Sequence, residues 1–225
     1  SSIDATFDGN GNYVSGSILQ YVVVEYAGGA TLSENGAVRI ESSSPFIDHD
    51  IIRNNKADGV HAWNGVGMRI TDNSITDNGI TGSAVAAGMY VSGTGATTIS
   101  DNSVTNNASG TMAGIAAFGG TVSVTNNTSS NNTSGITFSN VTGTIQGNTV
   151  NGNVGLGGIR IVGGDVTVSN NTISGNEFTV TNSGDGRGGG IDICGGSCNG
   201  FGGGTVMISN NTITYNYARN GANLG

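Results

Sequence analysis

Basic residues, proline and long apolar runs are nearly absent from this chain. Its 225 residues include one proline, one lysine and six arginines, and the net charge is −8. Seven basic residues are too few to form the positive patch that neutralises nucleic acid phosphates. The composition therefore argues against a nucleic acid partner. No segment approaches the ~20 apolar residues that span a membrane, so we expect no membrane span.

Cysteine is also scarce, since the chain has only Cys194 and Cys198. They lie four residues apart in a glycine-rich stretch, which is not the Cys-x-x-Cys spacing of redox sites. We predict a disulfide that closes a short loop and indicates an oxidising compartment. The few charges and the many hydroxyl and amide side chains also favour an extracellular or cell-surface protein. No cofactor is predicted.

Asparagine, in contrast, recurs in the pattern Asn-x-Φ-x-x-Asn, where Φ is an aliphatic residue. One copy is "NTISGN", from Asn171 to Asn176. The first position of the pattern is filled by Asp50, Asn73, Asn102, Asn127, Asn148, Asn171 and Asn211. The last is filled by Asn55, Asn78, Asn107, Asn132, Asn153, Asn176 and Asn216. Internal repetition of this kind indicates a solenoid or an array.

Two further motifs interleave with the asparagines. One is Gly-Φ-x-Φ, as in "GIRI" at Gly158, and the other is a short alternating segment before each asparagine pair, such as "VTV" at Val166. Alternation with a period of two predicts strands. We therefore predict an all-β fold, a single right-handed parallel β-helix of about eight coils with three short strands per coil.

The predicted β-helix forms one domain over residues 1–225. Residues 1–16 are expected to form an irregular N-terminal turn. Residues 177–204 are expected to form a long decorated loop region around one Gly-Φ-x-Φ strand, because the spacing between asparagine pairs rises there to 40 residues. Internal asparagine ladders are predicted at the corners, since asparagine tolerates a bend and its amide can satisfy inward-facing peptide groups. Asp50 is expected to replace an asparagine in one ladder.

These repeats resemble those of the pectate-lyase-like superfamily of parallel β-helices. The "ISNNTITYN" and "GGGIDI" stretches are most similar to repeats of secreted surface proteins and autotransporter passengers, over about Ser17 to Gly225. The resemblance implies the fold. It leaves the function open, because it covers lyases, hydrolases, epimerases, adhesins and inert stalks.

The resemblance also implies that an active groove would lie on the outward face of the Gly-Φ-x-Φ strands. There Arg39, Glu41 and His61 are candidate catalytic residues, and Trp63 and Tyr90 could stack on a sugar. A solvated sheet face is the favoured interpretation, because paired carboxylates are lacking. Arg160 and Asp192 share the same outward column on neighbouring coils, and we expect an exposed ion pair there.

Evidence for a metal is weak. Asp8, Asn10 and Asn12 resemble the start of a calcium loop, but the twelfth position is Leu19 instead of glutamate. A glycine-rich turn is therefore favoured over a calcium site. His49 is a single histidine at a predicted corner and a weak ligand candidate.

Three functions remain open. The leading one is an extracellular, non-catalytic structural or adhesive protein that assembles head to tail through uncapped ends, because open sheet edges invite pairing. Its partners would be itself or a surface polysaccharide. The alternative is a polysaccharide-acting lyase, hydrolase or epimerase. The third is ice binding, suggested by hydroxyl residues at Thr98, Ser123, Thr167, Thr172 and Thr212 in columns interrupted by Arg69, Gln146, Asn151 and Met207.

Overall fold

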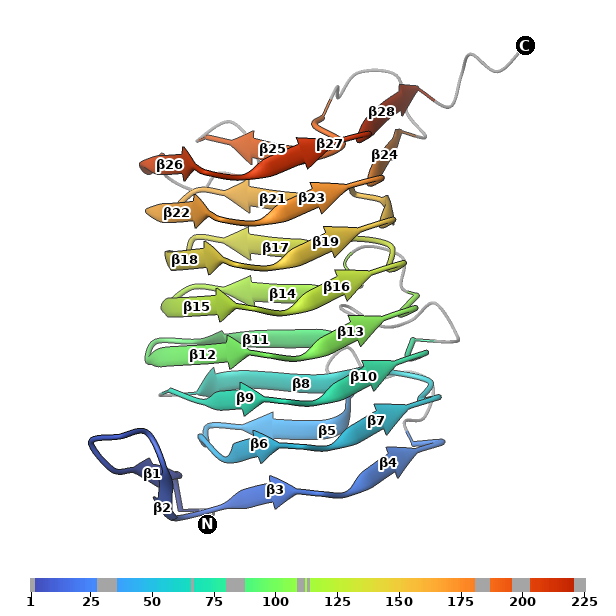
Figure 1. The fold of residues 1–225 in the computed structure, drawn as a ribbon. Helices are drawn as coiled ribbons and strands as arrows, with labels where there is room; N and C mark the ends of the chain where they lie inside the picture. Colours follow the sequence, from blue (N-terminus) through green and yellow to red (C-terminus); the bar gives the residue numbers. More distant parts are fainter. Residues whose placement is uncertain are drawn as a thin grey trace.

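The protein is a stack of short strands wound into a solenoid, as the computed structural model shows (Figure 1). The structure describes residues 3–27, 36–65, 67–79, 88–108, 112, 114–180, 187–195 and 203–220. Within these residues every regular element is a strand. The all-β prediction is therefore confirmed.

Three parallel sheets run along the rod. Sheet I contains β3 (Ile18–Gln20), β6 (Phe46–Asp48), β9 (Arg69–Thr71), β12 (Ala96–Ser100), β15 (Thr121–Thr125), β18 (Thr142–Gln146), β22 (Val166–Ser169) and β26 (Val206–Ser209). Sheet II contains β4 (Val23–Glu25), β7 (Ile51–Arg53), β10 (Ser74–Thr76), β13 (Ser103–Thr105), β16 (Thr128–Ser130), β19 (Thr149–Asn151), β23 (Thr172–Ser174) and β27 (Thr212–Thr214). Sheet III contains β5 (Gly36–Glu41), β8 (Asp58–Gly65), β11 (Met89–Gly93), β14 (Ile115–Phe118), β17 (Ile136–Ser139), β21 (Ile159–Val162) and β25 (Ile191–Cys194).

Each coil therefore contributes one strand to each sheet, as predicted. Sheets I and II have eight strands and sheet III has seven. The described residues thus form seven complete coils and the first two strands of another, slightly fewer complete coils than the eight predicted. A further three-stranded sheet joins β20 (Val154–Gly155), β24 (Glu177–Val180) and β28 (Tyr217–Asn220) at the later coils.

In-register stacking places equivalent inward residues of every coil on top of one another. In sheet I the stack includes Ile47, Ile70, Ile99, Val124, Ile145 and Val168, all fully buried. Sheet II continues the core with Ile52, Ile75, Val104, Val150 and Ile173. Ser129 interrupts this second stack, but its hydroxyl donates to the carbonyl of Gly135 at 3.0 Å, so its burial leaves no unpaired group.

The bends of each coil occur one residue before the asparagines of the repeat. Among the described residues, sixteen that are not glycine have positive φ, and most form two columns at these bends. The first column contains Tyr21, His49, Asp72, Asp101, Asn126, Asn170 and Asn210, with Gly147 in the same register. The second contains Tyr26, Asn54, Asp77, Asn106, Asn131 and Tyr215, with Gly152 and Gly175. The prediction that the ladder asparagines themselves take the bend is thus wrong; the residue before each of them does.

The predicted ladders are confirmed, and Asn127 shows their chemistry. Its Oδ1 accepts hydrogen bonds from the backbone N–H and the Nδ2 of Asn102, both at 2.9 Å. Its own N–H and Nδ2 donate to Oδ1 of Asn148 at 2.8 and 3.1 Å. Nδ2 also donates to the carbonyl of Ile99 at 2.9 Å. The buried amide therefore satisfies backbone groups of the preceding coil and also bonds to the asparagine side chain of the following coil.

The glycine of the Gly-Φ-x-Φ motif is required by the close approach of successive coils. A Cβ on Gly158 would lie 2.6 Å from the carbonyl oxygen of Gly190 and 3.0 Å from Nδ2 of Asn176. A side chain there would collide with both the next coil and the ladder. The sequence shows that this glycine recurs at the start of the motif. It does not show the close contact between coils that requires a glycine there.

At the N-terminal end, the segment predicted as an irregular turn contains an antiparallel hairpin of β1 (Thr6–Phe7) and β2 (Tyr13–Ser15). It packs on the outer side of sheet I, where the Phe7 ring meets Phe46 with centroids 5.2 Å apart. The Arg69 guanidinium lies 3.9 Å from the centroid of Phe7 and donates to the carbonyl of Gly11 at 2.7 Å. The predicted decorated loop region contains β24 and β25, while residues 181–186 and 196–202 lie outside the described residues.

We predict that Asn127→Ala lowers the free energy of unfolding by about 2–5 kcal/mol. The substitution leaves the N–H of Asn102 and the carbonyl of Ile99 buried without partners. Thr128→Ala, on the outward face of the next strand, is the control and should change stability by no more than about 0.5 kcal/mol. Urea unfolding of the two variants tests this, and equal small effects would contradict the role of the ladder.

Candidate functional site

Arg39, His61 and Tyr90 form one outward column on β5, β8 and β11 of sheet III. Arg39 pairs with His61 and His61 with Tyr90 in the parallel register. Glu41 and Trp63 pair with each other on β5 and β8. The structure therefore brings together the five residues that the sequence singles out for catalysis and sugar stacking.

The aromatic members of this group stack on one another. The His61 and Tyr90 rings are 4.5 Å apart and 13° from parallel. Tyr90 stacks in turn on Phe118 at 5.0 Å, and Trp63 meets the edge of His61 at 5.4 Å. The ring faces that would bind a sugar are thus largely in contact with other rings.

His61 is buried, with 2% of its surface exposed. Its Nδ1 lies 2.7 Å from Oδ2 of Asp58, which is fully buried on the same strand. Asp58 is absent from the sequence-based candidates because it precedes Gly59 and so lies outside the Gly-Φ-x-Φ positions. An aspartate three residues before a histidine, at the start of one repeat, is the signal that could have identified it.

The same local contact recurs three coils further along. Ser134, which also precedes the motif glycine, has its Oγ 3.2 Å from Oγ1 of Thr137, and both residues are buried. Asp58–His61 and Ser134–Thr137 therefore occupy equivalent positions of the repeat. This equivalence indicates that the pair holds the start of the strand, a structural role that needs no substrate.

Arg39 and Glu41 are exposed, but their charged groups contact neighbouring side chains. The Arg39 guanidinium lies 4.4 Å from the Trp63 ring centroid, and its Nη2 is 3.5 Å from Oε2 of Glu41. A cation over an aromatic face and a nearby carboxylate stabilise this arrangement weakly at the surface. The Glu41 carboxylate thus faces Arg39.

Further along the column, the outward positions are closed to solvent. Ala116 and Thr137 are both buried, although the sequence predicts a solvated sheet face there. Arg160 and Asp192 follow, with Nε and Oδ2 3.4 Å apart and side chains 11% and 13% exposed. The expectation of an exposed ion pair is therefore wrong. Burial, together with the positive charge of Arg187, lowers the pKa of Arg160.

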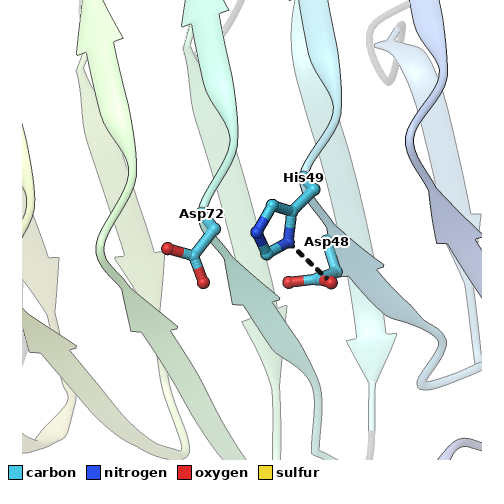
Figure 2. A group of neighbouring side chains, drawn as sticks. All are labelled: Asp48, His49 and Asp72. Carbon is cyan, nitrogen blue, oxygen red and sulfur yellow. Dashed lines mark ion pairs between the residues drawn. The ribbon is translucent and has the colours of Figure 1, made fainter.

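A second group of ionisable residues lies at a corner between sheets I and II. Figure 2 shows the imidazole of His49 between the carboxylates of Asp48 and Asp72. His49 Nδ1 is 2.8 Å from Oδ2 of Asp48. Asp48 also accepts hydrogen bonds from Oγ1 of Thr71 and Nε2 of Gln20, each at 2.6 Å.

These contacts shift two pKa values in opposite directions. Burial opposes ionisation of Asp48, but hydrogen bonds from Thr71, His49 and Gln20 outweigh it and lower the pKa of Asp48 below 3.8. The hydrogen bond to Asp48 raises the pKa of His49 above 6.5, and the nearby negative charges add to this effect. Asp48, His49 and Asp72 each have one possible metal-ligand atom, and these three atoms lie within 4.8 Å of one another. Because Nδ1 of His49 is already in contact with the Asp48 carboxylate, we interpret the group as an ion pair.

Asp8, Asn10 and Asn12 form the turn of the N-terminal hairpin. Oδ1 of Asp8 accepts from the backbone N–H groups of Asn10 and Asn12 at 2.9 and 2.8 Å, and Oδ2 accepts from Nδ2 of Asn12 at 2.9 Å. The side-chain hydrogen bond from Asn12 contributes most to lowering the pKa of Asp8. The carboxylate is thus used by the turn itself, as the glycine-rich turn interpretation expects, and calcium binding stays a weak prediction.

Two other sequence predictions concern the C-terminal part and the membrane. Cys194, at the end of β25, is disulfide-bonded; Cys198 lies outside the described residues, so the pairing of the two stays a prediction. Among the residues that the structure describes, no helix has the length and apolar character to cross a bilayer.

We predict that NMR titration of His49 gives a pKa above 6.5 and that Asp48→Asn lowers it, because the variant removes the negative charge and leaves only a neutral amide oxygen as acceptor. His61→Gln identifies the resonance, since the chain has two histidines. The raised pKa means that His49 stabilises the fold below pH 6.5 and that this contribution is lost as the pH rises through the folded-state pKa. An unchanged pKa in Asp48→Asn would contradict the assigned ion pair.

Comparison with known proteins identifies the fold family. A family model described as right handed beta helix region matches residues 6–164. No curated protein and no solved structure matches this chain. The match covers more than half of the chain, and the strands form a parallel β-solenoid, so this protein belongs to the right-handed β-helix family.

Proposed function

We propose that this protein is an extracellular, non-catalytic β-solenoid with a structural or adhesive role. The observation that carries the proposal is the Asp58–His61 pair, which the Ser134–Thr137 pair repeats three coils away. His61, the best candidate for acid–base chemistry, is buried in a contact whose equivalent occurs in another coil without any histidine. This weighs against the alternative of a polysaccharide-acting enzyme with a groove at Arg39, Glu41 and His61.

The internal ladders support a structural role. Asparagine amides, with the Asp50 carboxyl group at one position, link each described coil to the next along both columns of corners. Each link joins segments that are more than twenty residues apart in sequence. The result is a rod whose stiffness comes from its interior, which leaves the outer faces free to present side chains.

The two outer coils support end-to-end assembly of copies of the chain. Within the described residues, the outer edges of β3 and β4 and those of β26 and β27 have no strand partner. Apolar side chains of these strands are exposed, including Ile18 and Val23 at one end and Ile208 and Ile213 at the other. A further coil from a second copy would pair these edges and cover these side chains.

We expect the purified chain to form rods longer than one molecule in a concentration-dependent way, because open edges pair when copies meet. Mass photometry across a dilution series, with negative-stain electron microscopy, measures this. Ile213→Lys places a charge at the exposed end and should shift the distribution to monomers, whereas Thr149→Lys in the middle of sheet II should not. A strict monomer at all concentrations would contradict the assembly, though not the structural role of a single rod.

A second candidate function, ice binding, is favoured by the outer face of sheet II. From β10 to β27, the outward positions are all serine or threonine except Asn151. The interruptions at Arg69, Gln146 and Met207 belong to sheet I instead. Six in-register strands thus present an uncharged hydroxyl array with a repeat of ~4.8 Å along the rod, and β-branched threonine holds its hydroxyl in few rotamers.

If this face binds ice, the chain should show thermal hysteresis and shape ice crystals. Thr149→Lys should abolish both, because a charged side chain disrupts the array at its centre. Thr167→Lys, at an outward position of sheet I, is the matched control and should retain them. Nanolitre osmometry gives the measurement, and the absence of hysteresis in the wild-type chain would exclude this function.

A further inference from the structure

One position of the asparagine ladder holds a carboxyl group in place of an amide. Asp50 is 1% exposed and lies between β6 and β7, at the first corner of its coil. Its Oδ1 accepts from the backbone N–H of Val22 at 2.9 Å, and its own N–H donates to Oδ1 of Asn73 at 2.9 Å. In these two hydrogen bonds Asp50 acts as the asparagines do.

The second side-chain atom cannot act as an amide nitrogen does. At the six other positions of this ladder, Nδ2 donates to a carbonyl of the preceding coil at 2.8–3.1 Å. At five of them Nδ2 also donates to Oδ1 of the next ladder asparagine. The equivalent acceptors for Asp50 are the carbonyl of Leu19 and Oδ1 of Asn73.

Oδ2 of Asp50 is buried and has no hydrogen-bond partner. If the carboxyl group were ionised, its Oδ2 would be buried beside acceptors and would receive no hydrogen bond, which is unfavourable in a buried site. A protonated carboxyl group resolves the conflict, since its hydroxyl can donate as the amide nitrogen does at the other positions.

We propose that Asp50 is a neutral carboxylic acid in the folded protein, that its Oδ2–H replaces the amide donor of the ladder, and that the first coil is therefore held to the second more firmly in acid than at higher pH. The first coil here means β3, β4 and the corner between them, where the Val22 N–H donates to Asp50. This property goes beyond the proposed structural function and does not depend on it.

The charges around Asp50 agree with this assignment. Burial is the main cause that raises the pKa of Asp50, and the negative charge of Asp48 adds to it, while the hydrogen bond from Val22 and the charge of His49 oppose it. Tyr21 on the preceding coil lies with its ring 5.0 Å from that of His49, and Asp72 on the following coil faces His49. Glu25 and Arg53 pair with each other at 2.9 Å on the adjoining strands.

The sign of the pH dependence follows from the direction of the shift. An acid whose pKa is raised by folding stabilises the fold fully below its unfolded pKa of 3.8, and this contribution is lost as the pH rises through the folded-state pKa. Asp48 acts in the opposite sense, because its pKa is lowered. His49 acts in the same sense as Asp50 but above pH 6.5.

The chain provides a matched pair of variants for the test. Asn55 is the equivalent position of the second ladder in the same coil, and its Nδ2 donates to the carbonyl of Val24 at 3.1 Å and to Oδ1 of Asn78 at 2.8 Å. Asp50→Asn should raise Tm at pH 7 by about 2–4 °C and flatten the dependence of Tm on pH above 3.8. Asn55→Asp should steepen it. Both variants are also made with His49→Gln, which removes the titration of the neighbouring imidazole.

Two direct measurements keep the proposal testable if Asn55→Asp fails to fold. In ¹³C NMR the Asp50 carboxyl should titrate above 3.8. In hydrogen exchange, the Val22 amide, which donates to Asp50, should lose protection with rising pH relative to the Ala27 amide, which donates to Oδ1 of Asn55 at 2.8 Å. An Asp50 carboxyl that titrates at or below 3.8, or an Asp50→Asn variant with the pH dependence of the wild type, would overturn the proposal.

Discussion

The hydrogen bond between stacked asparagine side chains is the interaction on which the rest of this structure depends. A coil of only three short strands must turn sharply, and each bend directs peptide groups toward the interior where no water can satisfy them. The buried amides of Asn102 and Asn127 meet this need because each has both a donor and an acceptor. With the corners satisfied, the aliphatic residues between them can stack as a continuous core.

The sequence predicts the architecture well because the same physical requirement recurs in every coil. Alternation in segments such as "VTV" specifies strands, and the spacing of Asn171 and Asn176 specifies the two corners. The sequence does not distinguish the residue with the left-handed backbone conformation from the residue whose side chain joins the ladder, because asparagine is suited to both positions. Asn170 takes the left-handed conformation and Asn171 enters the ladder, and only the backbone geometry separates them. The sequence does not predict the hairpin of residues 6–15 for another reason. The hairpin is not part of the repeat, and it depends on contacts with Phe46 and Arg69.

The sequence predicts which residues of the candidate site are neighbours. It does not predict which of them are buried and which are exposed to solvent. Period-two alternation places Arg39, His61 and Tyr90 in one column, and the register of β5, β8 and β11 agrees. Whether a column is open to solvent is not encoded in its periodicity, and His61, Ala116 and Thr137 are buried. The partner of His61 is Asp58, at a repeat position that is elsewhere occupied by small residues. A departure from the consensus of a repeat therefore identifies such contacts better than the chemistry of the outward residues alone.

The amides of each ladder also share one direction. From Asn73 to Asn171, each Oδ1 accepts from the coil before it, and each backbone N–H donates to the coil after it. A section through the ladder between two of these coils would therefore expose, on one surface, the backbone N–H and carbonyl groups that the next asparagine binds, and on the other surface the amide of that asparagine. The two surfaces differ, so the rod has a chemical polarity along its axis. The direction of the chain is therefore a property of its interior as well as of its sheets.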